Sequence, residues 1–188
     1  MKLAVVVDTF PRWSERFIAR ECAELLRRGV DLSLFCLKAG ALPGGGADPD
    51  FAGLNERCIE LPRCIMPRAL SSDHEDAELR RRRALAKKEL GLSAYAKVQC
   101  AHTLANLLRE GRFTHVHAHF ASLPSTIAWI AAHAAKLPLS MSVHARDVFV
   151  DAQLLEEKIT DCARVFTCHA RARDYLLQKC RFPDERKK

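Results

Sequence analysis

The chain has 188 residues, 48% of them hydrophobic and 28% charged, which is the composition of a globular protein with one sizeable core. A formal net charge of +7 favours phosphate-bearing or anionic partners without choosing among them. No stretch approaches the ~20 apolar residues of a membrane-spanning helix, and no signal peptide precedes the first strand-like run. We therefore expect a soluble, cytoplasmic protein.

Cysteine usage argues against a zinc site. The eight cysteines stand at positions 22, 36, 58, 64, 100, 162, 168 and 180, and no two of them form a Cys-x-x-Cys pair. Because structural zinc sites need closely paired ligands, we expect no metal at these thiols. Buried, reduced thiols are the simpler interpretation.

The first 37 residues predict a βαβ unit. Residues 3–7 are a continuous apolar, β-branched run typical of a strand buried on both faces, and residues 8–13 are expected to form a loop. Ser14 is the expected N-cap of a helix that Gly29 ends. Residues 30–37 predict the second strand. A βαβ unit commits the sheet to parallel strands.

The next segment is irregular before it becomes helical. Residues 39–53 predict an exposed loop, and the glycines at 44–46 are no phosphate-binding fingerprint because no helix pattern follows them. Residues 58–61 predict a short strand. Residues 72–75 (Ser-Asp-His-Glu) fit a capping box that opens a long helix, and residues 94–108 predict another helix.

The long helix carries a basic run, Arg80, Arg81, Arg82 and Arg83. Four consecutive arginines circle a helix, so a solvated helix is the simplest interpretation. A contact with phosphate or with an anionic membrane surface stays open. Recognition of nucleic acid is not expected, because no aromatic residues interleave with the basic ones.

Strands and helices alternate through the rest of the chain. Strands are predicted at 114–118, 139–143 and 164–168, and helices at 122–135, 153–159 and 171–179. The sequence therefore predicts an α/β fold: a doubly wound, mostly parallel, Rossmann-like sheet with helices on both faces. We expect one domain over residues 1–180, followed by a charged tail at 181–188.

Polar residues follow several predicted strands, where open α/β sheets bind ligands. His115, His117 and His119 alternate and so share one face of a strand. No carboxylate or cysteine is spaced along the chain to complete a metal site, so we expect hydrogen bonding to a hydroxyl-rich ligand instead. His119 stands nearest the carboxyl end, and His115 is expected to lie near the surface or to be structural.

His144 and Asp147 follow the strand at 139–143. One interpretation is an ordinary loop histidine with its hydrogen bonds satisfied. The functional one is a side chain that reaches a sugar hydroxyl or phosphate oxygen, with Asp147 orienting it or binding an acceptor hydroxyl.

A third loop, residues 9–15, precedes a helix whose free N–H groups can meet a phosphate. It contains no G-x-G-x-x-G, so a dinucleotide cofactor is not expected. Phe10 and Trp13 are bulky enough to stack on a sugar.

Taken in order, these segments resemble the N-terminal domain of a retaining glycosyltransferase of family 4 with the GT-B fold. Residues 8–18 (DTFPRWSERFI) resemble its first loop, residues 115–121 (HVHAHFA) its His-x-His-Phe strand end, and residues 142–147 (SVHARD) its Thr-x-His-x-x-Asp segment. Residues 167–169 (TCH) resemble the strand before the domain hinge.

The resemblance implies transfer of a sugar from a nucleoside-diphosphate-sugar donor to a glycan or polyprenyl-linked acceptor, with retention and without a further cofactor. The resemblance is to the bacterial enzymes that build surface polysaccharides, such as those of colanic-acid biosynthesis, at the inner face of the membrane. His144 and Asp147 would contact donor sugar and acceptor in the active site. Substrate binding would fall to Thr9, Phe10, Ser14, Glu15, His117 and His119.

The main departure from the family is length, because the second GT-B domain, which holds the nucleotide, is expected to be absent. We therefore expect an incomplete site, to be completed by a C-terminal domain of a longer chain or by a partner chain. Two other interpretations remain open: a non-catalytic acceptor-binding subunit and an unrelated phosphate- or nucleotide-binding α/β domain.

Overall fold

The computed structural model of the chain describes residues 1–42, 48–62 and 76–182. Three sequence features lie outside the described residues: the predicted capping box at 72–75, the glycines at 44–46, and Cys64.

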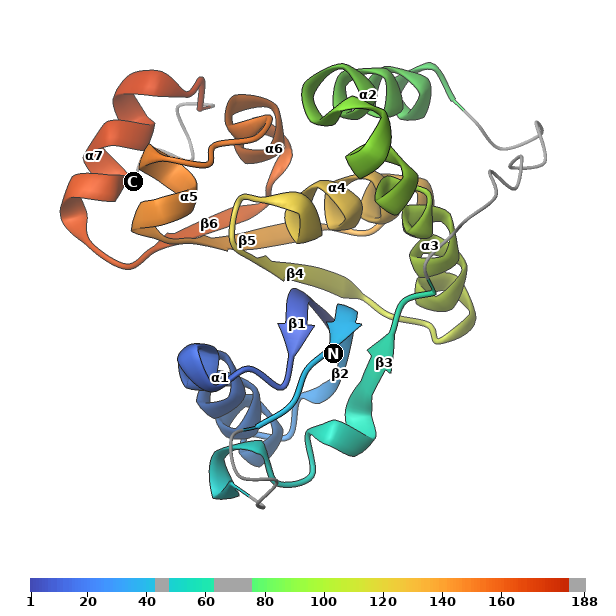
Figure 1. The fold of residues 1–188 in the computed structure, drawn as a ribbon, viewed down its shortest axis with the longest axis vertical. Helices are drawn as coiled ribbons and strands as arrows, with labels where there is room; N and C mark the ends of the chain where they lie inside the picture. Colours follow the sequence, from blue (N-terminus) through green and yellow to red (C-terminus); the bar gives the residue numbers. More distant parts are fainter. Residues whose placement is uncertain (43–47, 63–75, 183–188) are drawn as a thin grey trace.

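A six-stranded parallel sheet forms the centre of the molecule (Figure 1). Its strands, in chain order, are β1 (Lys2–Phe10), β2 (Asp31–Ala39), β3 (Cys58–Glu60), β4 (His115–His119), β5 (Leu139–Val143) and β6 (Arg164–Thr167). Their spatial order is β3-β2-β1-β4-β5-β6, and every neighbouring pair is parallel. The predicted Rossmann-like α/β fold is confirmed.

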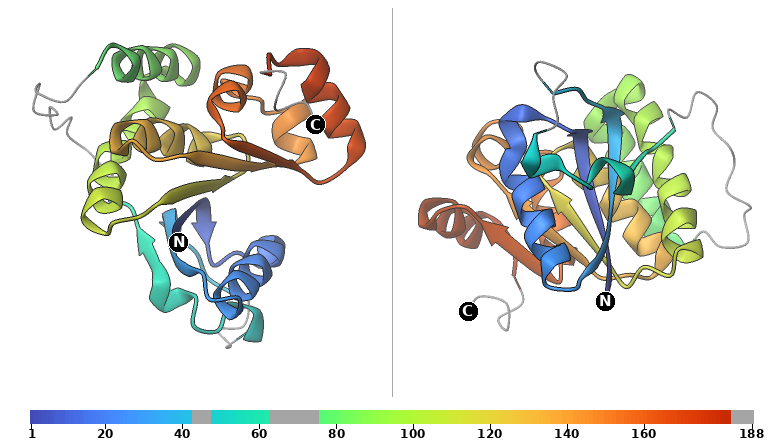
Figure 2. Two further views of the ribbon diagram at one scale, coloured as in Figure 1. Left: turned by 180° about the vertical axis from the view of Figure 1, so that it is seen from behind. Right: turned by 90° about the horizontal axis from the view of Figure 1, so that it is seen from below.

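The helices cover the two faces of the sheet unequally. They are α1 (Arg16–Arg27), α2 (Ala77–Val98), α3 (Cys100–Glu110), α4 (Leu123–Ala135), α5 (Ala145–Phe149), α6 (Leu155–Asp161) and α7 (Ala170–Lys179). Figures 1 and 2 place α1 on one face and α2, α3 and α4 on the other. Among the described residues, α1 is the only α-helix that contributes to the hydrophobic core of its face.

Strand β1 divides its side chains between the two cores. Ala4 and Val6 pack toward α3 and α4, whereas Leu3, Val5 and Val7 pack toward α1. A strand with buried residues on both faces reads as a continuous apolar run rather than an alternating one. This is why the run at its start predicted a central strand.

Two glycines with positive φ shape the helices: one follows the end of α1, and the other bends α2. Gly29 has φ +79° after the last turn of α1, as the sequence predicted. Gly91 has φ +68° inside α2 and bends it. The helix predicted at 94–108 is divided between two elements: residues 94–98 end α2, and α3 runs from Cys100 to Glu110.

The first loop begins later than predicted. Strand β1 continues to Phe10 because it stays paired with β2 as far as Ala39. The prediction of Ser14 as an N-cap was wrong: a 3-10 turn spans Trp13–Glu15, closed by the Glu15 N–H on the Arg12 carbonyl at 3.0 Å. Helix α1 then begins at Arg16.

Near the carboxyl terminus the differences are small. Helix α5 was missed because five residues are too few to show a helical period. Helix α6 runs from Leu155 to Asp161, two residues later than predicted. Most described cysteines are buried as expected, but Cys58 is half-buried and Cys168 is exposed. No described helix is both long and apolar enough to cross a membrane.

The basic run on α2 is not a uniform surface patch. Arg82 is buried, whereas Arg81 is exposed. The Arg82 guanidinium donates to the Trp129 carbonyl at 2.9 Å, pairs with Asp161 at 2.9 Å, and lies 4.6 Å from the centre of the Trp129 ring. It thereby ties α2 to α4 and α6.

Replacing Arg82 with methionine should lower the free energy of unfolding by about 2 kcal/mol, because the Trp129 carbonyl and Asp161 each lose one buried interaction with the guanidinium. Urea unfolding would measure the loss. Arg81→Met is the matched control: in the part of the chain that the structure describes, Arg81 forms its hydrogen bonds with Glu78 at the surface, so its loss should cost under about 0.5 kcal/mol. Equal effects of the two substitutions would contradict the assigned role.

Candidate functional site

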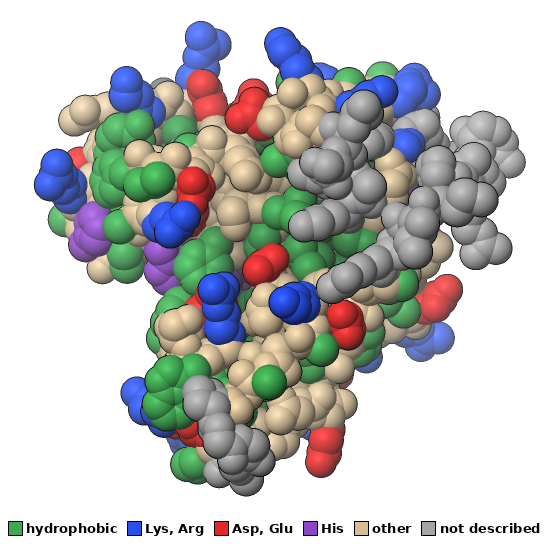
Figure 3. All heavy atoms as spheres, in the orientation of Figure 1, with side chains coloured by type: hydrophobic (Ala, Val, Ile, Leu, Met, Phe, Trp, Pro, Cys, Tyr) green, Lys and Arg blue, Asp and Glu red, His purple; other side chains and the backbone are tan. Residues whose placement is uncertain are grey.

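The candidate site lies at the carboxyl ends of β1, β4 and β5. The strand order reverses between β1 and β4, and open parallel sheets bind ligands in the crevice at such a point. Figure 3 shows histidine side chains along a recess between the half that carries α1 and the half that carries α7. Apolar side chains lie beside them.

Strand β4 carries three histidines, of which His117 and His119 are buried. His117 Nδ1 lies 2.8 Å from Ser140 Oγ, and His117 Nε2 lies 3.1 Å from Ser142 Oγ on the neighbouring β5. His115 Nε2 lies 2.8 Å from the same Ser140 hydroxyl. His119, at the end of the strand, is 1% exposed.

The turn from β5 into α5 positions His144. Asp147 is buried, and its Oδ1 accepts the His144 backbone N–H at 2.8 Å. Its Oδ2 accepts the backbone N–H of Ala121, which follows β4. The carboxylate therefore joins the ends of β4 and β5. Of the two roles predicted for Asp147, orienting His144 is the one that this geometry supports.

Four rings form an aromatic cluster, defined as Phe17, His119, Phe120 and His144. The His144 ring lies 4.6 Å from the Phe120 ring, 5.0 Å from the Phe17 ring and 6.4 Å from the His119 ring. Phe17, from α1, is 42% exposed and so forms the open side of the cluster. An aromatic surface beside hydrogen-bonding groups is suited to a sugar ring, which has apolar faces and polar edges.

Burial keeps the histidines of the site neutral. It lowers the pKa of His117 to about 4 and the pKa of His119 to about 3, because the charged imidazolium loses its hydration. Burial also lowers the pKa of His144, and the nearby Asp147 carboxylate opposes that shift. Neutral rings can both donate and accept a hydrogen bond, as recognition of a hydroxyl requires.

A buried lysine, Lys158, stabilises the turn that follows β4. Lys158 on α6 has no exposed surface, and its ammonium donates to the Ala121 carbonyl at 2.7 Å, Ser125 Oγ at 2.9 Å and Thr126 Oγ1 at 3.2 Å. These bonds fix the turn that begins at Phe120, whose φ of +68° is unfavourable for a side chain with a Cβ.

The first loop reaches the site only in part. Glu15 is half-buried and bonds to Arg12 at 3.0 Å, and burial raises its pKa. Ser14 is exposed, and the Thr9 hydroxyl donates to Asp8 at 3.1 Å. Phe10 is 4% exposed and packs on Phe51, with 5.6 Å between ring centres. Its ring belongs to the core, so it cannot stack on a ligand without leaving it.

The structure thus brings His117, His119, His144 and Asp147 together. Sequence reasoning missed Phe17 and Glu21, which α1 directs toward β4. One feature of the sequence could have found Glu21. Residues four apart on a helix share a face, so Glu21 lies on the same side of α1 as Phe17, which borders the site.

Asp147→Asn should destabilise the protein by about 2 kcal/mol, because an amide N–H₂ would face a backbone N–H where the carboxylate now accepts. Thermal and urea unfolding would measure it. Asp151→Asn is the control, since the exposed Asp151 side chain bonds to Arg146 at the surface. If Asp147→Asn left the stability unchanged, the assignment of Asp147 as a positioning residue would fail.

Comparison with known proteins agrees with this architecture. The family model described as Glycosyltransferase Family 4 matches residues 14–187. No curated protein sequence matches the chain significantly.

Two similar solved structures are UDP-N-acetylglucosamine 2-epimerases. One has a TM-score of 0.56 and 14% identity over 98% of this chain and 47% of its own. The other, from Methanocaldococcus jannaschii, has a TM-score of 0.55 and 10% identity over 95% of this chain and 42% of its own. Identities this low show a shared fold, and the chain spans less than half of the length of either protein.

Proposed function

The chain belongs to glycosyltransferase family 4, and on that premise we propose that it forms the N-terminal, acceptor-side half of a sugar-transfer site. The reaction would move a sugar from a nucleoside-diphosphate-sugar donor to a glycan or polyprenyl-linked acceptor with retention of configuration. Surface-polysaccharide synthesis of the colanic-acid type, on the cytoplasmic side of a bacterial membrane, is the setting that we propose.

The observation that carries this proposal is the meeting of neutral, buried histidines with an aromatic cluster at the β1–β4 crevice. His119 and His144 stand on the ends of two neighbouring strands, with ring centres 6.4 Å apart. Both His119 ring nitrogens and His144 Nε2 are buried without a hydrogen-bond partner among the described residues. Unpaired polar groups at a strand-end crevice are suited to the hydroxyls of a bound sugar.

We assign His144 the contact with the reacting sugar. Asp147 is assigned the role of holding His144 in position. His117 and His119 line the floor. Ser14 and Glu15 lie at the amino-terminal end of α1 and would approach the donor phosphates or the acceptor, with Thr9 behind them. Phe10 supports that loop from the core.

The donor nucleotide is proposed to bind mainly to a second domain, supplied by a longer chain or by a partner. The support is the coverage: the chain matches under half of each similar structure. No separate cofactor is proposed for the transfer. A peripheral contact of the exposed Arg80 and Arg81 with an anionic membrane would bring the site to a lipid-linked acceptor.

A non-catalytic acceptor-binding subunit is the second candidate. It is favoured by the Asp147 carboxylate, because backbone N–H groups already occupy both of its oxygens. The third interpretation, an unrelated phosphate-binding α/β domain, has no support from the family match.

Histidine ring NMR of the chain distinguishes these functions. Glycan acceptors should shift the ring signals of His119 and His144, whereas free nucleoside diphosphate should leave them nearly unchanged. Tight nucleotide binding without any response to glycans would contradict both leading candidates. Sugar transfer, assayed by mass spectrometry with a panel of nucleotide-sugars and a nucleotide-binding second domain present, separates the transferase from the subunit.

A further inference from the structure

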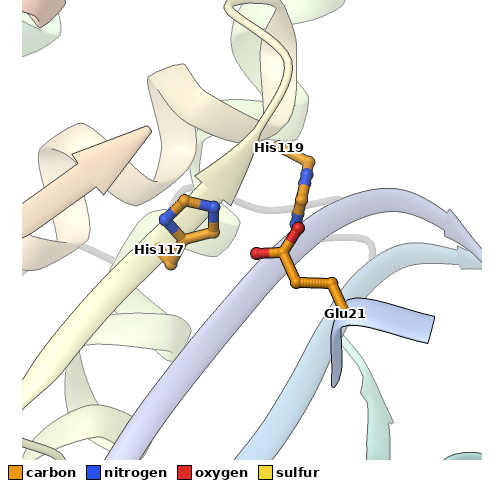
Figure 4. A group of neighbouring side chains, drawn as sticks. All are labelled: Glu21, His117 and His119. Atoms are coloured by element: carbon orange, nitrogen blue, oxygen red, sulfur yellow. The ribbon is translucent and has the colours of Figure 1, made fainter. Parts of the chain in front are cut away.

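Three side chains far apart in the sequence converge beside the crevice: Glu21 from α1 and His117 and His119 from β4. One potential ligand atom of each lies within 4.8 Å of those of the other two. Figure 4 shows the Glu21 carboxylate directed at the His119 ring, with the His117 ring beside them. Two imidazoles and a carboxylate are a ligand set common to divalent transition metals.

The ring of His119 makes no hydrogen bond in the described part of the chain. Its side chain is 1% exposed, yet neither Nδ1 nor Nε2 has a hydrogen-bond partner. Glu21 Oε2 lies 4.0 Å from Nε2. Buried polar groups in proteins nearly always have a partner, so this ring is built for a contact that the protein itself does not supply.

His117 is held as a metal-binding histidine usually is. Its Nδ1 lies 2.8 Å from the Ser140 hydroxyl, which fixes the orientation of the ring. A second group bonded to the far nitrogen is typical of liganding imidazoles. The Nε2 contact with Ser142 is longer, 3.1 Å, and rotation of that hydroxyl frees the nitrogen.

The electrostatics of the group favour a cation. Its three members are one carboxylate and two imidazoles, each of which can donate an electron pair to a metal. Within the described residues, the only ion-pair contact of Glu21 is with His119, so no lysine or arginine competes for its charge.

We propose that Glu21, His117 and His119 bind one divalent transition-metal ion, with Zn²⁺ the best match. Mg²⁺ and Ca²⁺ prefer oxygen ligands and are disfavoured by two imidazoles. Three protein ligands leave a fourth tetrahedral position for water or a ligand oxygen, as in open zinc sites. The carboxylate, which the spacing around the histidines did not supply, comes from a different element of the fold.

Such an ion would join α1 to β4 across the point where the strand order reverses. It would also stand beside the aromatic cluster, since the His119 ring lies 6.4 Å from the His144 ring. This site does not depend on the proposed sugar transfer: the chain would bind the metal whatever reaction it serves.

The test uses the purified 188-residue chain, stripped with a chelator and titrated with Zn²⁺ by calorimetry. We expect one ion per chain. Glu21→Gln and His119→Gln should each weaken binding by more than the roughly 10- to 100-fold typical of losing an outer-shell partner. His133→Gln, on α4 and outside the group, should keep the wild-type affinity.

Co²⁺ distinguishes this site from the eight cysteines. Nitrogen and oxygen ligands give visible bands without the near-ultraviolet charge-transfer band of thiolate ligation. No binding of Zn²⁺, unchanged binding in Glu21→Gln, or a spectrum dominated by thiolate bands would each overturn the proposal. If His119→Gln fails to fold by circular dichroism, Glu21→Gln decides alone, because the Glu21 side chain is 46% exposed and its replacement is structurally mild.

Discussion

Replacing Lys158 with methionine is expected to lower the free energy of unfolding by about 3 kcal/mol. The buried ammonium donates to the Ala121 carbonyl, Ser125 Oγ and Thr126 Oγ1, and methionine fills the same volume without donating to any of them. The loss should appear in urea unfolding, followed by the fluorescence of Trp129, which is fully buried on α4.

The same residue predicts how stability depends on pH. Burial lowers the pKa of Lys158 from its ordinary 10.5 to about 7. Between these values the unfolded chain binds a proton that the folded chain does not, so stability should rise with pH, by at most ~1.4 kcal/mol per unit. Below pH ~7 both states are protonated and this contribution to the slope vanishes.

Lys87→Met is the matched control for both measurements, because Lys87 is exposed on α2. It should leave the stability within about 0.5 kcal/mol of the wild type and keep the alkaline rise. Lys158→Met should remove that rise. An unchanged pH profile in Lys158→Met would show that the lysine is not the titrating group.

The sheet was predictable because its strands obey local rules. The strand at 139–143 was predicted to the residue, since an alternation of apolar residues with serines is bounded by Pro138 on one side and His144 on the other. The helix α4 was equally clear from Ser122 and Pro124 at its start. Both elements have their boundary signals within a few residues of themselves.

Elements whose ends depend on distant pairing were not predictable in the same way. Strand β1 runs to Phe10 because β2 pairs with it that far, and no local signal at Asp8 reports that pairing. Gly91 bends α2 through its φ of +68°, although glycine inside a helical pattern is usually tolerated without a break.

In the candidate site, too, local patterns were predictable and tertiary contacts were not. Strand alternation predicted that His117 and His119 share a face, and that prediction is confirmed by their ring centres, 4.9 Å apart. Arg82 and Lys158 were not foreseen, because a charged residue in an amphipathic helix is normally solvated. Only tertiary packing against α4 shows that each is buried and bonded.

The two faces of the sheet explain why the functional groups gather where they do. The face covered by α2, α3 and α4 holds the larger hydrophobic core. On the opposite face, α1 packs over β1 and β2, and strands β4 and β5 carry His117, His119, Ser140 and Ser142. An apolar core would exclude such side chains, so the less covered face is where ligand chemistry can be placed without sacrificing the fold.

His144→Ala is expected to reduce sugar transfer by about 100-fold or more, if the ring contacts the reacting sugar as proposed. The assay requires the chain together with its nucleotide-binding domain and compares kcat/KM for the acceptor. His133→Ala is the matched control, because His133 lies in the last turn of α4 and its ring bonds to Asp76, which is outside the candidate site.

The pH profile distinguishes a direct contact from a structural one. Burial lowers the pKa of His144, so the neutral ring persists below pH 6.5, and kcat/KM should fall only when acid protonates it. In His144→Ala this acid limb should disappear, whereas a variant that merely loosens the aromatic cluster, such as Phe17→Leu, should keep it. Transfer by His144→Ala at the wild-type rate would remove His144 from the active site, and with it the reason for placing the sugar against the ends of β4 and β5.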